Sequence, residues 1–264
     1  MRRQWTSSAG IAVTALLTLF LIIPVLLSVY AGLTVSYARG ASAGFTLDWV
    51  RQVWELYSNT VWRSLVVALL TLVVTLLIGV PGAYALVRKG GRFARAVEEI
   101  VTLPVAVPGL ALALALILTY GGAGTFRQST LFVVVGHALY TLPFMMRSVI
   151  AVLETIDWRT LDEGAASLGA PAWRRFVDVI LPNVRPGIVA GALTVVTLSI
   201  GEFNLTWMMH TPLTKTLPVG LADAYASMRL EIASAYTLIF LIMVIPLLIG
   251  VQLVASLTER RTQS

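Results

Sequence analysis

The sequence predicts an all-α membrane protein with six transmembrane helices. Three observations lead to this fold class: an apolar composition, six apolar stretches of spanning length, and basic residues gathered in alternate connections. Of the 264 residues, 58% are hydrophobic and only 12% are charged, and the mean hydropathy is +0.85. A soluble domain carries about 25% charged residues. Because so little polar surface cannot cover a water-soluble globule of this size, we expect lipid to be the main solvent.

Six stretches are long enough to cross a bilayer. A helix needs about 20 apolar residues to cross a hydrocarbon core about 30 Å thick, and inside that core every backbone amide needs a partner within the segment. The stretches are residues 9–35, 61–87, 100–120, 130–152, 186–209 and 233–257. We assign them to one transmembrane domain, residues 1–264, in which a first helix precedes a five-helix core over 61–257.

The first stretch has two interpretations. Arg2 and Arg3 precede it, as basic residues precede the apolar region of a cleaved signal peptide. That region is typically 7–15 residues long, and this stretch is about twice as long. We therefore expect a retained transmembrane helix.

Prolines recur within the predicted spans, where each removes a backbone donor and can kink its helix. Ordinary membrane-helix composition is one explanation, because such helices tolerate proline better than soluble ones do. Bent helices around a cavity are the other, and the closely spaced Pro104 and Pro108, followed by Gly109, favour it. The prolines in question are Pro24, Pro81, Pro104, Pro108, Pro143 and Pro246.

The basic residues predict that both termini are cytoplasmic. Cytoplasmic connections carry an excess of Lys and Arg, and most of the 19 basic residues fall in one set of alternate connections. This topology explains the net charge of +6 better than binding to nucleic acid does. The cytoplasmic set is Arg2, Arg3, Arg88, Lys89, Arg92, Arg95, Arg147, Arg159, Arg174, Arg175, Arg185, Arg260 and Arg261. The opposite set is Arg39, Arg51, Arg63, Arg127, Lys215 and Arg229.

Several chemistries are excluded or disfavoured by composition. The chain has no cysteine, which excludes disulfides, thiolate metal sites and cysteine nucleophiles. The two histidines, His137 and His210, lie far apart in the chain without a carboxylate at metal-ligand spacing, so we expect no metal site.

The longest cytoplasmic connection between spans, residues 153–185, is predicted to form a helical hairpin. In its first arm Leu161, Ala165 and Leu168 recur at helical spacing. Gly169 is a natural helix stop, and Pro171 suits the first turn of a second helix.

The second arm carries an apolar stripe of Trp173, Phe176, Val177 and Ile180, with Arg174, Arg175 and Asp178 facing away and Leu181-Pro182 closing the helix. Such a stripe needs a partner. The residues alone leave two possibilities open: another protein, or the membrane surface and the chain's own helices.

The hairpin resembles the EAA loop of permeases of binding-protein-dependent ABC importers. The run Glu163-Gly-Ala-Ala-Ser-Leu-Gly169, followed by Val179-Ile-Leu-Pro182, keeps the spacing of that motif throughout. Two positions depart from it, Gly164 for alanine and Val179 for isoleucine, and both keep a small or apolar side chain. The stretch from Leu142-Pro143-Phe144 through Arg147 and Leu153 to Ile156-Asp157 is similar to what precedes this loop in the family. The resemblance extends over roughly 61–257.

The resemblance implies the fold and mechanism of a type I ABC importer permease in a bacterial inner membrane. Its loop is a coupling helix that docks on a cytoplasmic ATPase, where Glu163 would supply a polar contact, Gly164 and Ala165 close approach, and Gly169 the turn. Trp173 and Phe176 would anchor the hairpin, either on the ATPase or beneath the permease. The implied loop residues are Glu163, Gly164, Ala165, Gly169, Trp173, Phe176, Leu181 and Pro182.

The same resemblance implies partners rather than an enzyme. The chain itself would bind no cofactor, because ATP and Mg belong to an ATP-binding cassette ATPase dimer. A second permease subunit, preferably a different one, and a periplasmic or lipid-anchored solute-binding protein would complete the importer.

The solute is only loosely indicated. Glu202 is the one acidic residue inside a predicted span, and intramembrane carboxylates tend to face a cavity, so Glu202 and Asn204 are candidates for the solute pathway. Glu202 could equally pair with another helix or lie at the outer interface. The segment around them, with Thr211-Pro212 and Thr216-Leu217-Pro218, resembles the branch that serves polyamines, ferric iron and phosphonates.

Two other function classes compete with the importer. An ion-coupled carrier or channel would need a coupling-ion site and internal repeats, and the sequence has one intramembrane acid and no clear repeat. A membrane enzyme would need a GxSxG nucleophile elbow or an HExxH helix at a membrane face. HExxH does not occur, and the GxSxG spacing at Gly40–Gly44 lies in a connection between predicted spans. GxxxxGK[ST] is also absent, so the chain has no P-loop for ATP.

Overall fold

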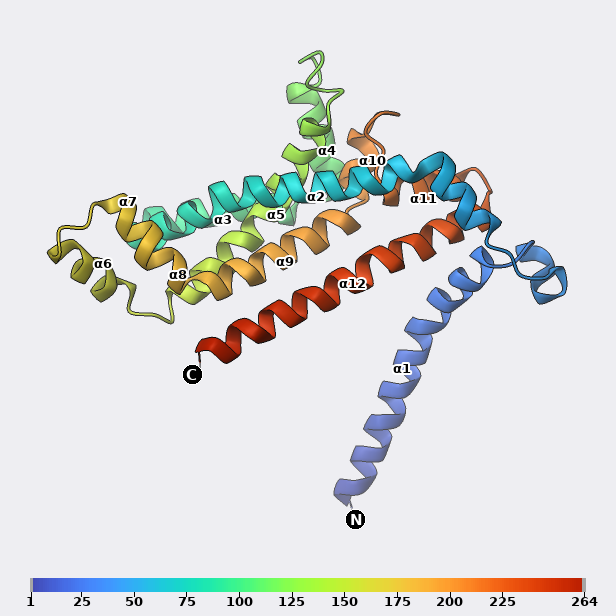
Figure 1. Ribbon diagram of the computed structural model, residues 1–264, viewed down its shortest axis with the longest axis horizontal. Helices are drawn as coiled ribbons and strands as arrows, with labels where there is room; N and C mark the ends of the chain where they lie inside the picture. The colour runs from blue at the N-terminus through green and yellow to red at the C-terminus, as the bar shows by residue number, and fades with distance from the viewer. Residues whose placement is uncertain (1, 263–264) are drawn as a thin grey trace. The chain divides into compact units, whose positions relative to one another are not determined.

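The computed structural model describes the backbone of residues 2–262 and the side chains of residues 10–250 (Figure 1). The described chain is helical, with no strand beyond a single antiparallel bridge between Thr34 and Phe45, which confirms the predicted all-α class. The elements in order are α1 (Arg2–Gly32), η1 (Tyr37–Ala43), α2 (Asp48–Lys89), α3 (Gly91–Ala106), α4 (Gly109–Tyr120), α5 (Thr130–Leu153), α6 (Trp158–Ser167), α7 (Ala172–Arg174), η2 (Arg175–Ile180), α8 (Leu181–Asn183), α9 (Arg185–Gly201), α10 (Asn204–Met209), α11 (Leu217–Ala226) and α12 (Leu230–Thr262).

By length and composition, four of the described helices can cross a membrane: α1, α2, α5 and α12. Two bent helix pairs raise the number to six if each pair is one span. In the first pair, α3 and α4, the bend is 105°; in the second, the segment Ala172–Asn183 and α9, it is 74°. The first, second, fourth and sixth predicted spans are therefore single helices, and α5 ends one residue beyond the predicted 130–152.

Two predicted spans are not continuous helices. The span predicted over 100–120 breaks at Val107 and Pro108, because proline lacks an amide donor and disfavours helical backbone in the residue before it. The span predicted over 186–209 breaks at Glu202 and Phe203, where the Glu202 backbone is extended and its carboxylate accepts hydrogen bonds from the first amides of α10.

The chain divides into two compact units, which we describe separately. The first contains the chain up to Asn59 together with Gly220–Met243. Within it the Trp49 indole donates to the Thr34 carbonyl oxygen at 2.9 Å, and the Tyr37 amide donates to the Glu231 carboxylate, also at 2.9 Å. Along α1 the side chains from Gly10 to Leu27 are exposed, as expected of an apolar helix surrounded by lipid.

The second unit contains Thr60–Val219 and the chain from Val244 onward, and α5 is its central helix. Val67 of α2 packs on Val133 and Val134 of α5. On another side of α5, Phe132 packs with residues of α4 and α10, namely Ala113, Leu116, Leu205 and Met209. Because three neighbouring elements share α5, its position fixes the core of this unit.

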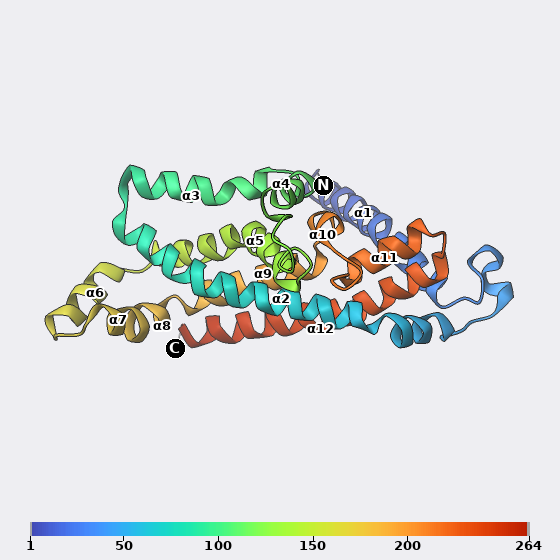
Figure 2. The ribbon, with the colours of Figure 1, turned by 90° about the horizontal axis from the view of Figure 1, so that it is seen from above.

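Helices α5 and α9 lie side by side in both ribbon views (Figures 1 and 2). Two glycines one turn apart on α9 make this close contact possible. A Cβ built on Gly187 would lie 2.5 Å from the Ser148 carbonyl oxygen, and one on Gly191 would lie 2.8 Å from the Met145 sulfur. This is the small-xxx-small packing of membrane helices, in which the backbones touch directly.

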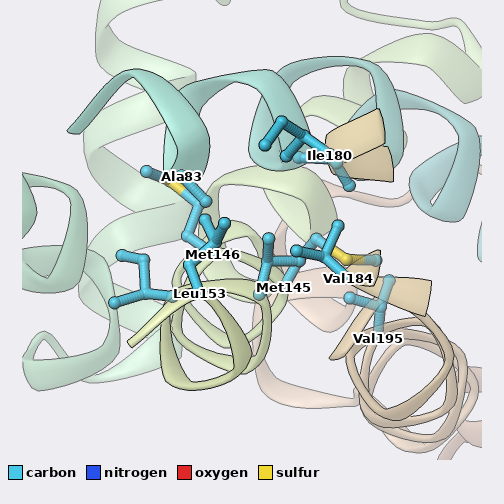
Figure 3. Close-up of a cluster of buried hydrophobic side chains, with 10 residues drawn as sticks. Ala83, Met145, Met146, Leu153, Ile180, Val184 and Val195 are labelled. Atoms are coloured by element: carbon cyan, nitrogen blue, oxygen red, sulfur yellow. The ribbon is translucent and has the colours of Figure 1, made fainter. Parts of the chain in front are cut away.

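The largest cluster of buried side chains lies where α2, α5 and the start of α9 meet the hairpin (Figure 3). Ile180 of the hairpin is fully buried there, together with Leu153 at the end of α5 and Val184 before α9. The hairpin is therefore packed into the core at its base. The cluster members labelled in Figure 3 are Ala83, Met145, Met146, Leu153, Ile180, Val184 and Val195.

Candidate functional site

The first arm of the hairpin is α6, and Asp157 caps its start. The Asp157 carboxylate accepts hydrogen bonds from the Thr160 amide at 3.3 Å and the Thr160 hydroxyl at 2.6 Å. These bonds lower the pKa of Asp157. Because the folded pKa lies below the unfolded one, the cap stabilises the arm above the unfolded pKa and loses its effect as the pH falls through the folded pKa.

Gly169 ends this arm, as the sequence predicts. Its φ of +84° is the left-handed conformation that glycine adopts without strain. The Gly169 amide donates to the Ala166 carbonyl oxygen at 2.9 Å, and the Ala170 amide donates to the Ala165 carbonyl oxygen at 3.1 Å. Together they form a Schellman motif, which satisfies the last carbonyls of the helix and turns the chain toward the second arm.

The second arm runs through α7, η2 and α8, and differs in three ways from the expected helix. Pro171 lies just before the arm, as the N-cap of α7, and Leu181-Pro182 does not close it, because helical backbone continues to Asn183. The turns over Arg175–Ile180 are also widened into a π-helix. Because Pro182 has no amide to donate, the usual i to i−4 ladder is interrupted there, and a wider turn fits.

The inner face of the hairpin is held by a charged group, which the predicted stripe does not include. Asp162 is only 6% exposed, and its carboxylate accepts hydrogen bonds from Arg175 Nη1 at 3.0 Å and from the Tyr84 hydroxyl at 3.2 Å. We call Tyr84, Asp162 and Arg175 the hairpin brace. It joins both arms of the hairpin to α2.

In both arms of the hairpin, the side chains that point inward differ from those expected from the sequence. Arg175 was expected to face away from the apolar stripe, yet it is half-buried on the inner face. On the first arm Leu161 and Leu168 are exposed, and Asp162 takes the buried position. The reason is that Arg175 and the Tyr84 hydroxyl both donate to the Asp162 carboxylate, so that Asp162 can occupy the buried position of the first arm.

Aromatic rings reinforce the brace. The Tyr84 ring lies 6.0 Å from the Trp158 ring, edge to face, and 5.5 Å from the Phe176 ring. Phe176 and Leu181 also pack against the buried cluster around Ile180. Of the two interpretations left open for Phe176, the structure therefore places it on the chain's own core.

The outer face of the hairpin has a different character. Leu168 at the turn is 88% exposed and Trp173 is 71% exposed, while Glu163 and Gly164 are exposed beside them. A Cβ at Gly164 would meet nothing within 4 Å, which leaves room for a partner to approach closely. We call Glu163, Gly164, Leu168 and Trp173 the docking face. Exposed large apolar side chains at a turn are typical of an interaction surface.

The residues predicted for the loop thus separate into two sets. Glu163, Gly164, Gly169 and Trp173 are exposed, whereas Phe176 and Leu181 pack inward; Ala165 is half-buried and Pro182 is exposed. The brace was not predicted from the sequence. The signal for it was one acidic and one basic residue, Asp162 and Arg175, on either side of the Gly169 turn.

A second polar site lies in the same unit at the break between α9 and α10. Glu202 Oε1 accepts from the Leu205 amide at 2.7 Å, and Oε2 accepts from the Thr206 amide at 2.9 Å and from the Thr206 hydroxyl at 2.8 Å. His137 of α5 contacts the Ser199 hydroxyl through Nδ1 at 2.8 Å and the Thr206 hydroxyl through Nε2 at 2.7 Å. We call these residues, Ser199, His137, Thr206 and Glu202, the polar chain.

For a neutral imidazole, the hydrogen bonds of the polar chain run in one direction. The Thr206 hydroxyl donates its only proton to Glu202, so it must accept from His137 Nε2. A neutral imidazole then has an acceptor at Nδ1, to which the Ser199 hydroxyl donates. In this arrangement each buried polar side-chain atom of these four residues has a hydrogen-bond partner, and Glu202 carries the only formal charge among them.

The structure brings Glu202 and Asn204 together at this break, but in different surroundings. The Glu202 side chain is 9% exposed with both oxygens engaged, and it pairs with its own segment. Asn204 is exposed, and a Cβ built on Gly109, at the start of α4, would lie 3.2 Å from Asn204 Cβ. The two helix breaks of the unit therefore meet. Within the described residues, no group of three or more His, Cys, Asp or Glu could hold a metal ion.

From the sequence, His137 was assessed only as a metal ligand, and the polar chain was not predicted. A lone histidine inside an apolar span was the available signal, because a polar group there needs a partner. The identity of that partner depends on how α5, α9 and α10 pack.

Comparison with known proteins agrees with the motif in the hairpin. Residues 75–264 match the family described as "Binding-protein-dependent transport system inner membrane component". The molybdenum transport system permease protein ModB of Azotobacter vinelandii is 32% identical over 190 residues, which cover 66% of this chain and 83% of that protein.

A second relative aligns over nearly the whole chain. The putative 2-aminoethylphosphonate transport system permease protein PhnV of Salmonella paratyphi A is 24% identical over 251 residues, or 94% of each chain. Among solved structures, a bacterial alginate ABC transporter in complex with an alginate pentasaccharide-bound periplasmic protein is similar at a TM-score of 0.72 and 18% identity, covering 99% of this chain and 96% of that one.

Proposed function

The chain belongs to the binding-protein-dependent transport system inner membrane components, and on that premise we propose how it works in its importer. It is a permease subunit of an ABC importer and a multi-pass membrane protein, so it is not the subunit that catalyses hydrolysis. We propose that its hairpin couples the solute pathway to a separate ATPase. The competing assignments as ion-coupled carrier and membrane enzyme are not supported by these relationships.

The observation that carries the proposal is the contrast between the two faces of the hairpin. The docking face presents Leu168 and Trp173 to a partner, whereas the brace fastens Asp162 and Arg175 to Tyr84 of α2. A surface that moved independently of the core could not transmit motion. Because the brace and the buried Ile180 tie the hairpin to α2 and α5, displacement of the docking face would move those helices as a rigid body.

We propose the following assembly. Two permease subunits, preferably different ones, sit on an ATP-binding cassette ATPase dimer, which binds the ATP and Mg. The hairpin and both termini face the cytoplasm, in accord with the distribution of basic residues. A solute-binding protein delivers the solute from the other side; a periplasmic protein is bound in the similar alginate transporter.

For the solute we propose a small molecule with an oxyanion group, such as a phosphonate. Two relatives are named for the transport of molybdenum and of 2-aminoethylphosphonate. Polyamines and ferric iron, the other classes that the sequence suggested, are cations that favour free carboxylates. Both oxygens of Glu202 already accept hydrogen bonds from α10, so we assign Glu202 the role of holding the break and the exposed Asn204 that of contacting solute.

Copurification tests the coupling role. The full chain, coexpressed with its proposed ATPase and solute-binding protein, is expected to copurify with the ATPase, and the loaded binding protein is expected to stimulate ATP hydrolysis. Leu168→Ala/Trp173→Ala should abolish both at unchanged membrane expression. Leu213→Ala, which truncates another exposed leucine of the same unit, is the matched control. Normal copurification and uptake by the double variant would refute the docking face.

Uptake in a strain that lacks other importers for these solutes tests the solute class. We expect competition by 2-aminoethylphosphonate or molybdate and none by spermidine. Competition by spermidine alone would refute the oxyanion assignment and leave the coupling role intact.

A further inference from the structure

The connection between α2 and α3 carries a dense group of exposed cations. Arg88, Lys89, Arg92 and Arg95 fall within eight residues that contain no carboxylate, and all four side chains are exposed. We call these four residues the basic junction.

An exposed apolar surface adjoins the basic junction. Phe93, Ile100 and Leu103 lie on one side of α3 and are each more than half exposed. The Lys89 ammonium lies 4.2 Å from the centre of the Phe93 ring, so cationic and aromatic groups meet at the start of the helix. A helix with an apolar face and basic residues along its edge is typical of a membrane interface.

The nearby carboxylates are partly turned inward. Glu98, one turn after the basic junction, lines a pocket of about 290 Å³ together with Arg95 and Glu154. Glu98 is half-buried, whereas Glu99, the next residue, and Glu154 are exposed. The four cations therefore exceed the exposed negative charge next to them.

The basic junction also lies next to the hairpin. The Arg88 guanidinium carbon is 6.0 Å from the centre of the Tyr84 ring, and the Tyr84 hydroxyl belongs to the hairpin brace. A ligand held at the junction would thus lie one helical turn from the contact that fixes the hairpin.

We propose that the basic junction binds the headgroup of an anionic phospholipid, whose acyl chains lie along the exposed face of α3. The phosphodiester of such a headgroup is negatively charged, and each Lys or Arg near a membrane surface strengthens attachment to anionic lipid. The Phe93, Ile100 and Leu103 face supplies contacts that lipid chains make and inorganic phosphate does not. The positive-inside rule needs only that the charges lie on one side; a bound headgroup requires that they act together.

Native mass spectrometry of the purified full chain tests this proposal without the importer's partners. The chain is equilibrated with equimolar phosphatidylglycerol and phosphatidylcholine of identical acyl chains, and the retained ratio is measured. We expect the wild type to retain phosphatidylglycerol preferentially and Arg92→Gln/Arg95→Gln to lower that ratio by roughly thirtyfold. Arg92→Lys/Arg95→Lys should keep most of the preference.

The matched control is Arg39→Gln/Arg51→Gln, which removes two exposed cations from the other compact unit. It should leave the ratio unchanged. An equal fall in the control, or no lipid preference in the wild type, would overturn the proposal. So would displacement of the retained lipid by millimolar inorganic phosphate, which would indicate a phosphate site. Circular dichroism identifies a variant that unfolds. If the glutamine variant unfolds, the lipid ratio of Arg92→Lys/Arg95→Lys tests the proposal, and loss of the preference in that folded variant would overturn it.

Discussion

The hairpin brace and the polar chain bury polar groups in the same unit by different means. The brace uses two full charges, Asp162 and Arg175, with a tyrosine hydroxyl as a third partner. In the polar chain, two backbone amides and the Thr206 hydroxyl donate to the single carboxylate of Glu202. Further hydrogen bonds link Thr206 to His137 and His137 to Ser199.

The difference follows from where each site lies. Arg175 is still 15% exposed at the edge of the core, where an ion pair is partly solvated, while His137 is 1% exposed inside α5. Burying a second charge there would be costly, so neutral donors disperse the negative charge instead. The comparison predicts that the brace is sensitive to an unpaired charge and the polar chain to an unpaired hydrogen bond.

Asp162→Ala is expected to have the largest effect, because it leaves the Arg175 charge buried without a partner. The expected loss of unfolding free energy is about 3 kcal/mol. Thermal unfolding of the purified chain in detergent measures it. Asp162→Leu/Arg175→Met, which removes both charges, should recover most of that loss; no recovery would mean that the charge is not the cause.

Glu202→Ala tests the other side of the comparison. It frees the Leu205 and Thr206 amides at the start of α10 without exposing an opposite charge. Loss of such a cap costs about 1–2 kcal/mol, less than Asp162→Ala. The same unfolding assay compares the two variants. A loss of unfolding free energy for Glu202→Ala that equals or exceeds that for Asp162→Ala would contradict the proposed difference between the polar chain and the brace.

His137→Phe should cost about 1–2 kcal/mol, since the Ser199 and Thr206 hydroxyls each lose a partner. Ser199→Ala alone removes one of these bonds. A double-mutant cycle between the two positions measures their coupling, which we expect to be close to the energy of one hydrogen bond. Strictly additive effects would contradict a hydrogen bond between His137 and Ser199.

Tyr84→Phe should have the smallest effect, about 1 kcal/mol, because it removes one hydroxyl and keeps the ring between Trp158 and Phe176. Tyr84→Ala, which also removes the ring, should cost several times more in the same unfolding assay. If both variants cost the same, ring packing contributes nothing to the brace.

Much of the fold could be predicted from the sequence because lipid imposes a simple length rule. The helix α5 ends within one residue of its predicted bound, and the Gly169 stop is where the residue type requires it. The closely spaced Pro104 and Pro108 indicated the bend between α3 and α4, whereas the break at Glu202 escaped prediction, because an average over apolar residues contains no information about bends. The inward position of Asp162 depends on Arg175 and on Tyr84, far away in the chain, and local periodicity favoured Leu161 and Leu168 instead.

The direct backbone contact of α5 and α9 at Gly187 and Gly191 has a mechanical consequence. These two helices lead into and out of the hairpin, since one ends at Leu153 and the other begins at Arg185. Long side chains between the two backbones could change rotamer and thereby absorb part of any displacement of the hairpin. Because the two helices touch closely at Gly187 and Gly191, a displacement of the hairpin would shift both helices together at that end.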